Sequence, residues 1–332
     1  MKLGTMHSIR AVVWVLMCCA SMCAVSDFVA AQTPYPNKPI KLIAPTLPGG
    51  GVDLVARTVA ERLALAFGQP VVVENQSAGA GIVASLATAR AAPDGYTLMI
   101  GYVGTHGVKP ALRTLPYDAV KDFTPIAMVG GTPNVLVVPV DFPADSLSGF
   151  VVHVKANPDK LAYGSGGFGT MPHLVMEQFK VATHIDLLHV AYRGVGQAFV
   201  DLFGGRIQAM LPGLAAAQPH IQAKRVKALA VTGISRHPLL PDIPTFRELG
   251  YEQFDGVQWY GVVGPANLPA PIVKRLSGEI AVLLQNAELR EQLSREALEP
   301  MQMTPDQFSH FMRSDIARWT KLVKERNIEI TE

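Results

Sequence analysis

The feature that most constrains this chain is an alternation, from residue 40 onward, of short β-rich runs with amphipathic helical runs. Residues 52–66, for example, place Val52, Val55, Val59 and Leu63 on one helical face. This alternation predicts an α/β fold, and its two sets of elements indicate two lobes. Strands are predicted at residues 40–44, 71–74, 96–100, 126–129, 135–140, 161–163, 187–192, 207–211, 226–231 and 257–263, and helices at 52–66, 82–92, 171–181, 197–203, 271–284, 287–296 and 304–325.

The first 31 residues have the features of a secretory signal peptide. A weakly positive start precedes an apolar run over residues 11–25, and small residues form a cleavage site before Gln32. A short membrane anchor and a lipoprotein attached through Cys23 are the alternatives. All cysteines (Cys18, Cys19 and Cys23) lie in this segment, so the mature chain would have no disulfide and no thiolate metal site. An exported protein without disulfides is typical of a bacterial periplasm.

The charge balance limits the classes of partner. The formal net charge is +2, and no lysine- or arginine-rich run occurs. This excludes the electrostatic footprint of a nucleic-acid-binding protein. A hydrophobic content of 49% with 17% charged residues indicates a globular chain rather than a disordered one.

Glycine-rich loops follow two strands of the first lobe and open helices. The first, "PTLPGGGVD", ends at Asp53, which either complements the helix dipole and pairs with Arg57 or accepts a hydrogen bond from a ligand or from the opposite lobe. The second is "NQSAGAG", residues 75–81. Free N–H groups at helix starts favour an anion, so both loops are candidate ligand walls.

Two further loops carry polar side chains. In "GTHG", residues 104–107, Thr105 and His106 are possible donors, and His106 is either a general base or a structural residue. In "YGSGGFGTMPHL", residues 163–174, Ser165 and Thr170 flank a glycine turn at a helix start. A small carboxylate or another oxyanion fits such a turn.

Two of these loops match dinucleotide fingerprints, but neither meets the second requirement. Gly164, Gly166 and Gly169 have the G-x-G-x-x-G spacing, and residues 79–84 fit G-x-G-x-x-A. A ribose-binding acid should end the next strand. One such strand ends "YTLMIG" without an acid, and Asp186 precedes the other. Nucleotide binding is therefore not favoured.

Patterns of catalysis and metal binding are weak. Ser165 lacks the G-x-S-x-G context, and no H-E-x-x-H occurs. His184 and His189 are five residues apart, a spacing that shares neither a helix face nor a strand face. We expect no metal and no cofactor.

Long stretches resemble the extracytoplasmic substrate-binding proteins of tripartite tricarboxylate transporters, the Bug receptors. The stretches include "PGGGVDLVAR", "APDGYTLMIG", "LPYDAVKDFTPIAMV", "HVAYRGVGQAFVDLFGGRIQAM" and "WYGVVGPANLPAPIVKRL". The resemblance implies a two-lobe periplasmic-binding-protein fold (type II). Each lobe is a mixed β-sheet flanked by helices, with a hinge and an interdomain cleft. Residues 32–137 and 256–332 would form lobe 1 and residues 138–255 lobe 2, with hinges near Val138 and Gly256.

The resemblance also implies which residues bind the ligand. On the first lobe they are Leu47, Pro48, Gly49, Gly50, Asp53, Ser77, Gly79, Ala80, Gly81, Thr105 and His106. On the second lobe they are Ser165, Gly166, Gly169, Thr170, Tyr192, Arg193, Gly194 and Asp201. Tyr102, Tyr192 and Trp259 could supply an aromatic wall.

The function implied is a monomeric periplasmic receptor, not an enzyme. It would capture a small carboxylate and deliver it to the integral-membrane permease subunits of the transporter. A sensing co-receptor for a signalling system, and an exported enzyme using His106 or Asp53, are the alternatives.

Overall fold

The computed structural model describes residues 35–328 except Gly50, Gln253, Asp255 and Glu296. The predicted signal peptide, residues 1–31, and its cysteines lie outside the described residues. None of the described helices is both long and apolar enough to cross a membrane. All the elements discussed below belong to residues 38–332.

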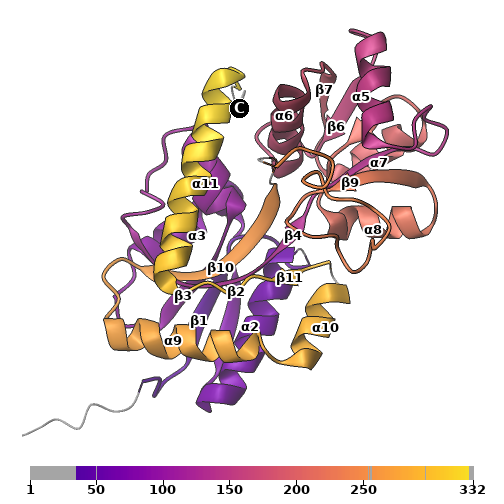
Figure 1. The fold of residues 1–332 in the computed structure, drawn as a ribbon. Helices are drawn as coiled ribbons and strands as arrows, with labels where there is room; N and C mark the ends of the chain where they lie inside the picture. The colour runs from indigo at the N-terminus through magenta and orange to yellow at the C-terminus, as the bar shows by residue number, and fades with distance from the viewer. Residues whose placement is uncertain (1–34, 50, 253, 255, 296, 329–332) are drawn as a thin grey trace, which may run out of the picture. The chain divides into compact units, whose positions relative to one another are not determined.

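The first sheet is mixed (Figure 1). β1 pairs in parallel with β2 and β3, whereas β10 runs antiparallel to β3 and β4. Ile40, Leu42 and Ile43 of β1 are fully buried, as expected for a parallel strand covered on both faces. The spatial order of its described strands is β11 (Glu299–Pro300), β4 (Phe123–Pro133), β10 (Val257–Pro265), β3 (Thr97–Tyr102), β1 (Ile40–Ala44) and β2 (Val71–Asn75).

Helices from both ends of the chain accompany this sheet (Figure 1). The last begins with a capping box, in which Thr304 and Gln307 exchange side-chain-to-backbone hydrogen bonds, as its predicted N-cap requires. These segments are α2 (Gly51–Phe67), η1 (Ala78–Gly81), α3 (Ile82–Ala89), η2 (Gly104–Val108), α4 (Lys109–Leu112), α9 (Ala270–Leu283), α10 (Ala287–Arg295) and α11 (Pro305–Glu325).

The second sheet is also mixed, which confirms the α/β class. β6 is parallel to β7 and β8, and β5 is antiparallel to β8 and β9. Its described strands lie in the order β7 (Leu188–Ala191), β6 (Ala162–Ser165), β8 (Ala209–Met210), β5 (Val135–Pro139) and β9 (Val226–Val231). The helices that connect them are α5 (Leu147–Ala156), α6 (Met171–Thr183), α7 (Val195–Phe203) and α8 (Leu214–Gln222).

Within the described residues, the chain passes between the sheets at two places, and both are hydrogen-bonded to Thr232. Asn134 separates β4 from β5, and Gly256 precedes β10. The Thr232 hydroxyl accepts from the Asn134 N–H (2.8 Å) and donates to the Gly256 carbonyl (2.8 Å). Val138, near which a hinge was predicted, lies inside β5. The division into moving lobes stays a prediction.

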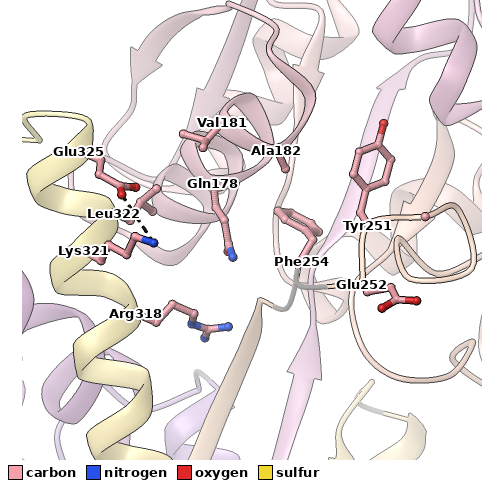
Figure 2. Close-up of a pocket in the computed structure, with 11 residues that line it drawn as sticks. Gln178, Val181, Ala182, Tyr251, Glu252, Phe254, Arg318, Lys321, Leu322 and Glu325 are labelled. Atoms are coloured by element: carbon pink, nitrogen blue, oxygen red, sulfur yellow. Dashed lines mark ion pairs between the residues drawn. The ribbon is translucent and has the colours of Figure 1, made fainter.

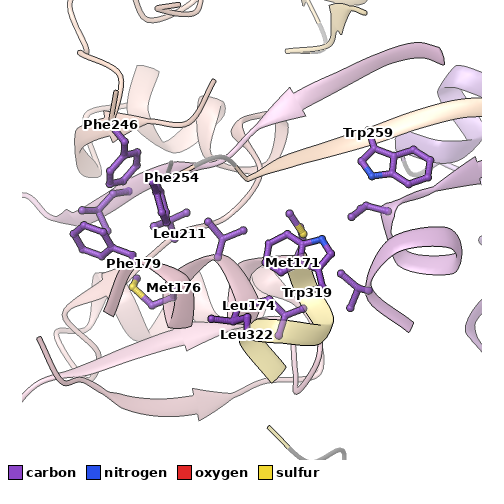
Figure 3. Packing of buried hydrophobic residues seen from close by; sticks show 14 of the residues in the cluster. Met171, Leu174, Met176, Phe179, Leu211, Phe246, Phe254, Trp259, Trp319 and Leu322 are labelled. Carbon is purple, nitrogen blue, oxygen red and sulfur yellow. The ribbon is translucent and has the colours of Figure 1, made fainter. Parts of the chain in front are cut away.

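The hydrophobic core continues from one sheet to the other through α6 and α11. Met171 and Leu174 of α6 belong to the same buried cluster as Trp319 and Leu322 of α11 (Figure 3). An ion pair extends this contact, because the Arg326 guanidinium lies 2.9 Å from the Glu177 carboxylate. α11, which accompanies the first sheet, is therefore packed against α6, which belongs to the second.

Candidate functional site

The carboxyl ends of β1, β2 and β3 meet at one edge of the first sheet, because the three strands are parallel. The loops that follow them, residues 45–49, 76–81 and 103–106, are called the first loop cluster here. A pocket of about 540 Å³ opens there. Its lining consists of Pro45, Thr46, Leu47, Pro48, Gly49, Ser77, Ala80 and Tyr102.

Asp53 holds the first of these loops from behind. Its carboxylate accepts from the Gly49 N–H (3.0 Å), from Arg57 Nε (2.9 Å) and from Asn75 Nδ2 (2.9 Å). The Asn75 amide also donates to the Thr46 carbonyl (3.1 Å). Burial by itself would raise the pKa of Asp53, but these hydrogen bonds lower it to about 2. The predicted pairing of Asp53 with Arg57 is confirmed, and Asp53 also orders the loop through Gly49 and Asn75, whereas its role toward a ligand stays a prediction.

The turn η1 needs glycine where the chain approaches its neighbours. Gly79, Ala80 and Gly81 all have positive φ, and Gly81 is the N-cap of α3. A Cβ on Gly81 would lie 2.8 Å from Thr105 Cγ2 and 3.1 Å from Pro45 Cβ. The three loops of the cluster are therefore packed together at Gly81.

Thr105 and His106 both lie in the interior, with no exposed surface. The Thr105 hydroxyl is 2.8 Å from His106 Nδ1, and the His106 ring meets Phe123 edge-on at 4.5 Å. Burial lowers the pKa of His106 to about 3, so the ring is neutral at physiological pH. In this structure these two side chains support the loop cluster from within rather than line its pocket.

The carboxyl ends of β6 and β7 meet in the same way at the second sheet. Residues 165–170 and 192–194 follow them and are called the second loop cluster. Ser165 is fully buried, and its hydroxyl lies 2.7 Å from His189 Nε2 and accepts from the Gly167 N–H (3.1 Å). The Thr170 hydroxyl donates to the Gly167 carbonyl (2.7 Å). These bonds fold the loop into a tight turn in front of α6.

The two loops of the second cluster touch each other. A Cβ on Gly166 would lie 3.4 Å from the backbone nitrogen of Val195. Gly169 and Gly194 have φ values of +68° and +138°, conformations that favour glycine. The Arg193 side chain is exposed beside this contact. The N-terminus of α7, which has no side-chain cap, is therefore next to a cation.

Asp201 lies close to the second loop cluster through Tyr192. The Tyr192 hydroxyl donates to Asp201 Oδ2 (2.7 Å), and Arg206 Nη1 is 2.6 Å from Asp201 Oδ1. Burial and the carboxylate raise the pKa of Tyr192 to about 12. Asp201 is thus paired locally, with Tyr192 and Arg206, and it holds the Tyr192 ring in place.

The structure adds Thr46 to the residues that line the first pocket and removes Trp259 from the predicted aromatic wall. Thr46 was not among the predicted site residues, yet it lines the first pocket, and its buried hydroxyl has no hydrogen-bond partner in the part of the chain that the structure describes. Tyr102 lines that pocket too, as its suggested wall role requires. Trp259 cannot supply a wall, because it is fully buried and its Nε1 donates to Asp315 (2.8 Å). Gly50 lies outside the described residues.

A larger pocket, of about 690 Å³, lies where α6 meets α11 (Figure 2). Three of its charged side chains interact with neighbours: Arg318 pairs with Asp315, and Lys321 lies 3.8 Å from Glu325. Gln178 reaches into it from α6, eight residues beyond Thr170 and so about 12 Å along the helix axis. This pocket is separate from both loop clusters. Among the described residues, no group of three or more potential metal-ligating side chains occurs.

Comparison with known proteins agrees with this architecture. Residues 55–328 match the model of the tripartite tricarboxylate transporter family receptor. Protein BugT of Bordetella pertussis is 34% identical over 305 residues, which cover 91% of this chain and 93% of BugT.

Solved structures agree as well. Rpa4515 of R. palustris with adipate is 32% identical, with a TM-score of 0.77 and coverage of 89% of this chain and 99% of that one. MatC (Rpa3494) from Rhodopseudomonas palustris with bound malate is 31% identical, with a TM-score of 0.72 and coverage of 87% and 100%. The fold is therefore the two-lobe α/β fold of periplasmic binding proteins. The chain belongs to the tripartite tricarboxylate transporter receptor family, whose members are solute-binding proteins.

Proposed function

We propose that this protein is a periplasmic receptor that binds a small carboxylate between its two loop clusters and delivers it to a membrane permease. One observation carries the proposal. Each sheet ends its parallel strands in glycine-rich turns that open helices, and the turns of each cluster pack against one another. Backbone N–H groups at such ends favour an anion. Adipate and malate, the molecules present in two related structures, are both carboxylates.

Arg193 is the residue we assign to the charge of the ligand. Its side chain is exposed next to Gly194 and the uncapped start of α7. A carboxylate placed there would accept from the guanidinium and from backbone N–H groups, and charge-assisted hydrogen bonds are the stronger kind. The Thr46 hydroxyl, which has no hydrogen-bond partner among the described residues, is the matching donor on the first loop cluster.

Binding would draw the two loop clusters together. A ligand that contacts both clusters only in a closed state shifts the population toward that state. The crossings at Asn134 and Gly256 are the segments about which this movement would occur. The closed form is the one that we propose the permease recognises. An exported enzyme has less support, because His106 is buried and the Asp53 carboxylate is engaged by three donors.

Thermal unfolding and calorimetric titration against adipate, malate, succinate and citrate test this proposal. A bound acid at a hundredfold excess over its Kd should stabilise the fold by about 2.7 kcal/mol. Arg193→Ala should weaken binding at least about tenfold. Arg225→Ala is the matched control, because it removes an exposed arginine that precedes β9, at the opposite edge of the second sheet. If none of these acids binds, the proposal of a carboxylate receptor is refuted. If Arg193→Ala and Arg225→Ala bind the acid equally well, the role assigned to Arg193 is refuted.

A further inference from the structure

Phe168 occupies an unusual place in the second loop cluster. Its side chain is 50% exposed, although Ser165 and Met171 on either side of it are buried. The ring meets His189 edge-on at 4.9 Å and His173 edge-on at 5.6 Å. Phe168 is therefore held at the tip of the loop with one side supported by the protein and the other facing solvent.

The rings beneath Phe168 form a stack that fixes its position. His173 and His189 lie parallel at 4.0 Å, and Tyr163 continues the stack at 4.8 Å from His189. The two histidines also hold the loop itself, because His173 Nδ1 accepts from the Gly169 N–H (3.0 Å) and His189 Nε2 is 2.7 Å from the Ser165 hydroxyl. Phe168 packs edge-on against this stack, which supports its ring from the protein side.

The first loop cluster offers a second exposed apolar side chain. Leu47, which lines the 540 Å³ pocket, is 70% exposed. No described residue at positions 45–49, 76–81 or 103–106 is a lysine or arginine. The nearby Arg57 is bound to Asp53, and His106 is neutral and buried. The first cluster therefore provides apolar contact and neutral hydrogen-bond donors rather than a fixed positive charge.

Building on the proposed function, we propose that the ligand is a carboxylate with an apolar body, an unsubstituted aliphatic chain or an aromatic ring, that packs between Phe168 and Leu47. Burial of this body against Phe168 and Leu47 would be favourable, and the Phe168 ring is already held by His173 and His189, so less conformational entropy is lost there on binding. Hydroxyl groups on the part of the ligand that faces Phe168 and Leu47 would lose water without gaining a hydrogen bond from these two side chains, which is unfavourable. Phe168 and Leu47 are thus specificity-determining residues.

A matched pair of acids tests this inference. Adipate and galactarate have the same six-carbon chain and the same two carboxylates, but galactarate carries four hydroxyl groups. Calorimetric titration of the wild-type protein should show adipate binding at least about tenfold more tightly. Benzoate should also bind more tightly than glycolate, a small hydroxylated monocarboxylate. Galactarate binding as tightly as adipate would overturn the inference.

Variants of the two side chains separate packing from folding. Phe168→Ala and Leu47→Ala should weaken adipate binding by about tenfold and leave malate binding within about twofold. Phe168→Leu keeps an apolar side chain and should retain most of the affinity for adipate. Leu65→Ala is the control, because Leu65 is 72% exposed on α2. Equal losses for adipate and malate in Phe168→Ala would overturn the inference.

The failure of this inference differs from the failure of the proposed function. Tight binding of malate or citrate without preference for the unsubstituted chain would leave a carboxylate receptor and remove the apolar body. If no acid of either panel binds, both proposals are wrong.

Discussion

Asp53 acts on the first loop cluster through its neighbours rather than through a surface of its own. Only 4% of the residue is exposed, and its two carboxylate oxygens are occupied by Gly49, Arg57 and Asn75. Asn75 in turn holds the Thr46 carbonyl. This one carboxylate therefore shapes the backbone that presents Thr46 and Leu47 to the pocket.

Asp53→Asn should lower the free energy of unfolding by about 1–3 kcal/mol at neutral pH, because three hydrogen-bond donors lose a charged acceptor that is itself buried. The folded-state pKa, about 2, lies below the ordinary 3.8. The charge therefore stabilises the fold above pH 3.8, and this contribution disappears as the pH falls toward 2. Urea denaturation of both proteins from pH 7 to pH 2 measures the difference, which should shrink only below about pH 4.

The half-exposed Asp94, which lies 3.5 Å from Lys38, provides the control for this series. Asp94→Asn should change stability by less than about 0.5 kcal/mol. A pH-independent difference between wild type and Asp53→Asn would show that the anchor is not electrostatic.

At the scale of elements, strands and helices with strong local patterns were predicted well. β1 and β9 begin and end at the predicted residues, and α6 and α11 differ from prediction by one or two residues at their ends. Among the missed helices are two of nine or ten residues, α5 and α8. α5 contains several β-branched valines, and α8 has Pro219 in its interior, so both lack the usual helical composition. Each forms because one apolar face is buried, as Phe150 of α5 shows.

β4 was predicted at residues 126–129 but extends over Phe123–Pro133. The additional residues include Gly130 and Gly131, which rarely favour a strand. Here glycine is needed, because a Cβ on Gly130 would lie 2.6 Å from the Glu299 carbonyl oxygen, and one on Gly131 would lie 2.3 Å from Val257 Cγ1. Close neighbours on β10 and β11 explain the length of the strand.

The Thr232 hydroxyl, which joins the two segments that cross between the sheets, gives a prediction at the scale of elements. Thr232→Val leaves the Asn134 N–H and the Gly256 carbonyl, both buried, without their shared partner. We expect a loss of about 1–3 kcal/mol of stability. Affinity for the carboxylate should fall about three- to tenfold, since looser crossings have more conformational entropy to lose on closure. Chemical denaturation and calorimetric titration measure the two effects.

Thr124→Val is the matched control, because the Thr124 hydroxyl makes similar bonds, to the Pro265 carbonyl and the Leu268 N–H, at the first sheet alone. It should cost comparable stability and leave affinity unchanged. The same loss of affinity in both variants would mean that the crossings have no special part in binding.

At the scale of the whole molecule, one buried charge cluster joins the elements of the two sheets. Glu177 of α6 accepts from the Tyr163 hydroxyl (2.7 Å), from Lys180 Nζ (2.9 Å) and from the guanidinium of Arg326 (2.9 Å). Arg326 is the residue that follows α11. Burial would raise the pKa of Glu177, but these donors lower it. The cluster lies under the histidine stack that supports Phe168, since Tyr163 belongs to both.

Glu177→Gln should lower the free energy of unfolding by about 1–3 kcal/mol, because Lys180 loses one charged partner and keeps Asp186 at 3.0 Å. Glu74→Gln removes an exposed carboxylate 3.6 Å from Lys41 and should cost less than about 0.5 kcal/mol. Equilibrium urea denaturation measures both losses. An m-value equal to that of the wild type would show that each variant changes stability without changing the folded or unfolded state. A loss in Glu177→Gln as small as in Glu74→Gln would show that the cluster adds no net stability.

The amino-acid sequence by itself determined the α/β class and the glycine-rich loops at strand ends. The spacing of hydrophobic residues, the turn residues and the helix caps that specify them act over a few neighbouring residues. Only the tertiary structure decided that His106 and Trp259 are buried, that Thr46 lines a pocket, and that α11 reaches α6. These features depend on contacts between residues far apart in the chain. Side-chain burial is a property of the packed molecule, and no local pattern specifies it.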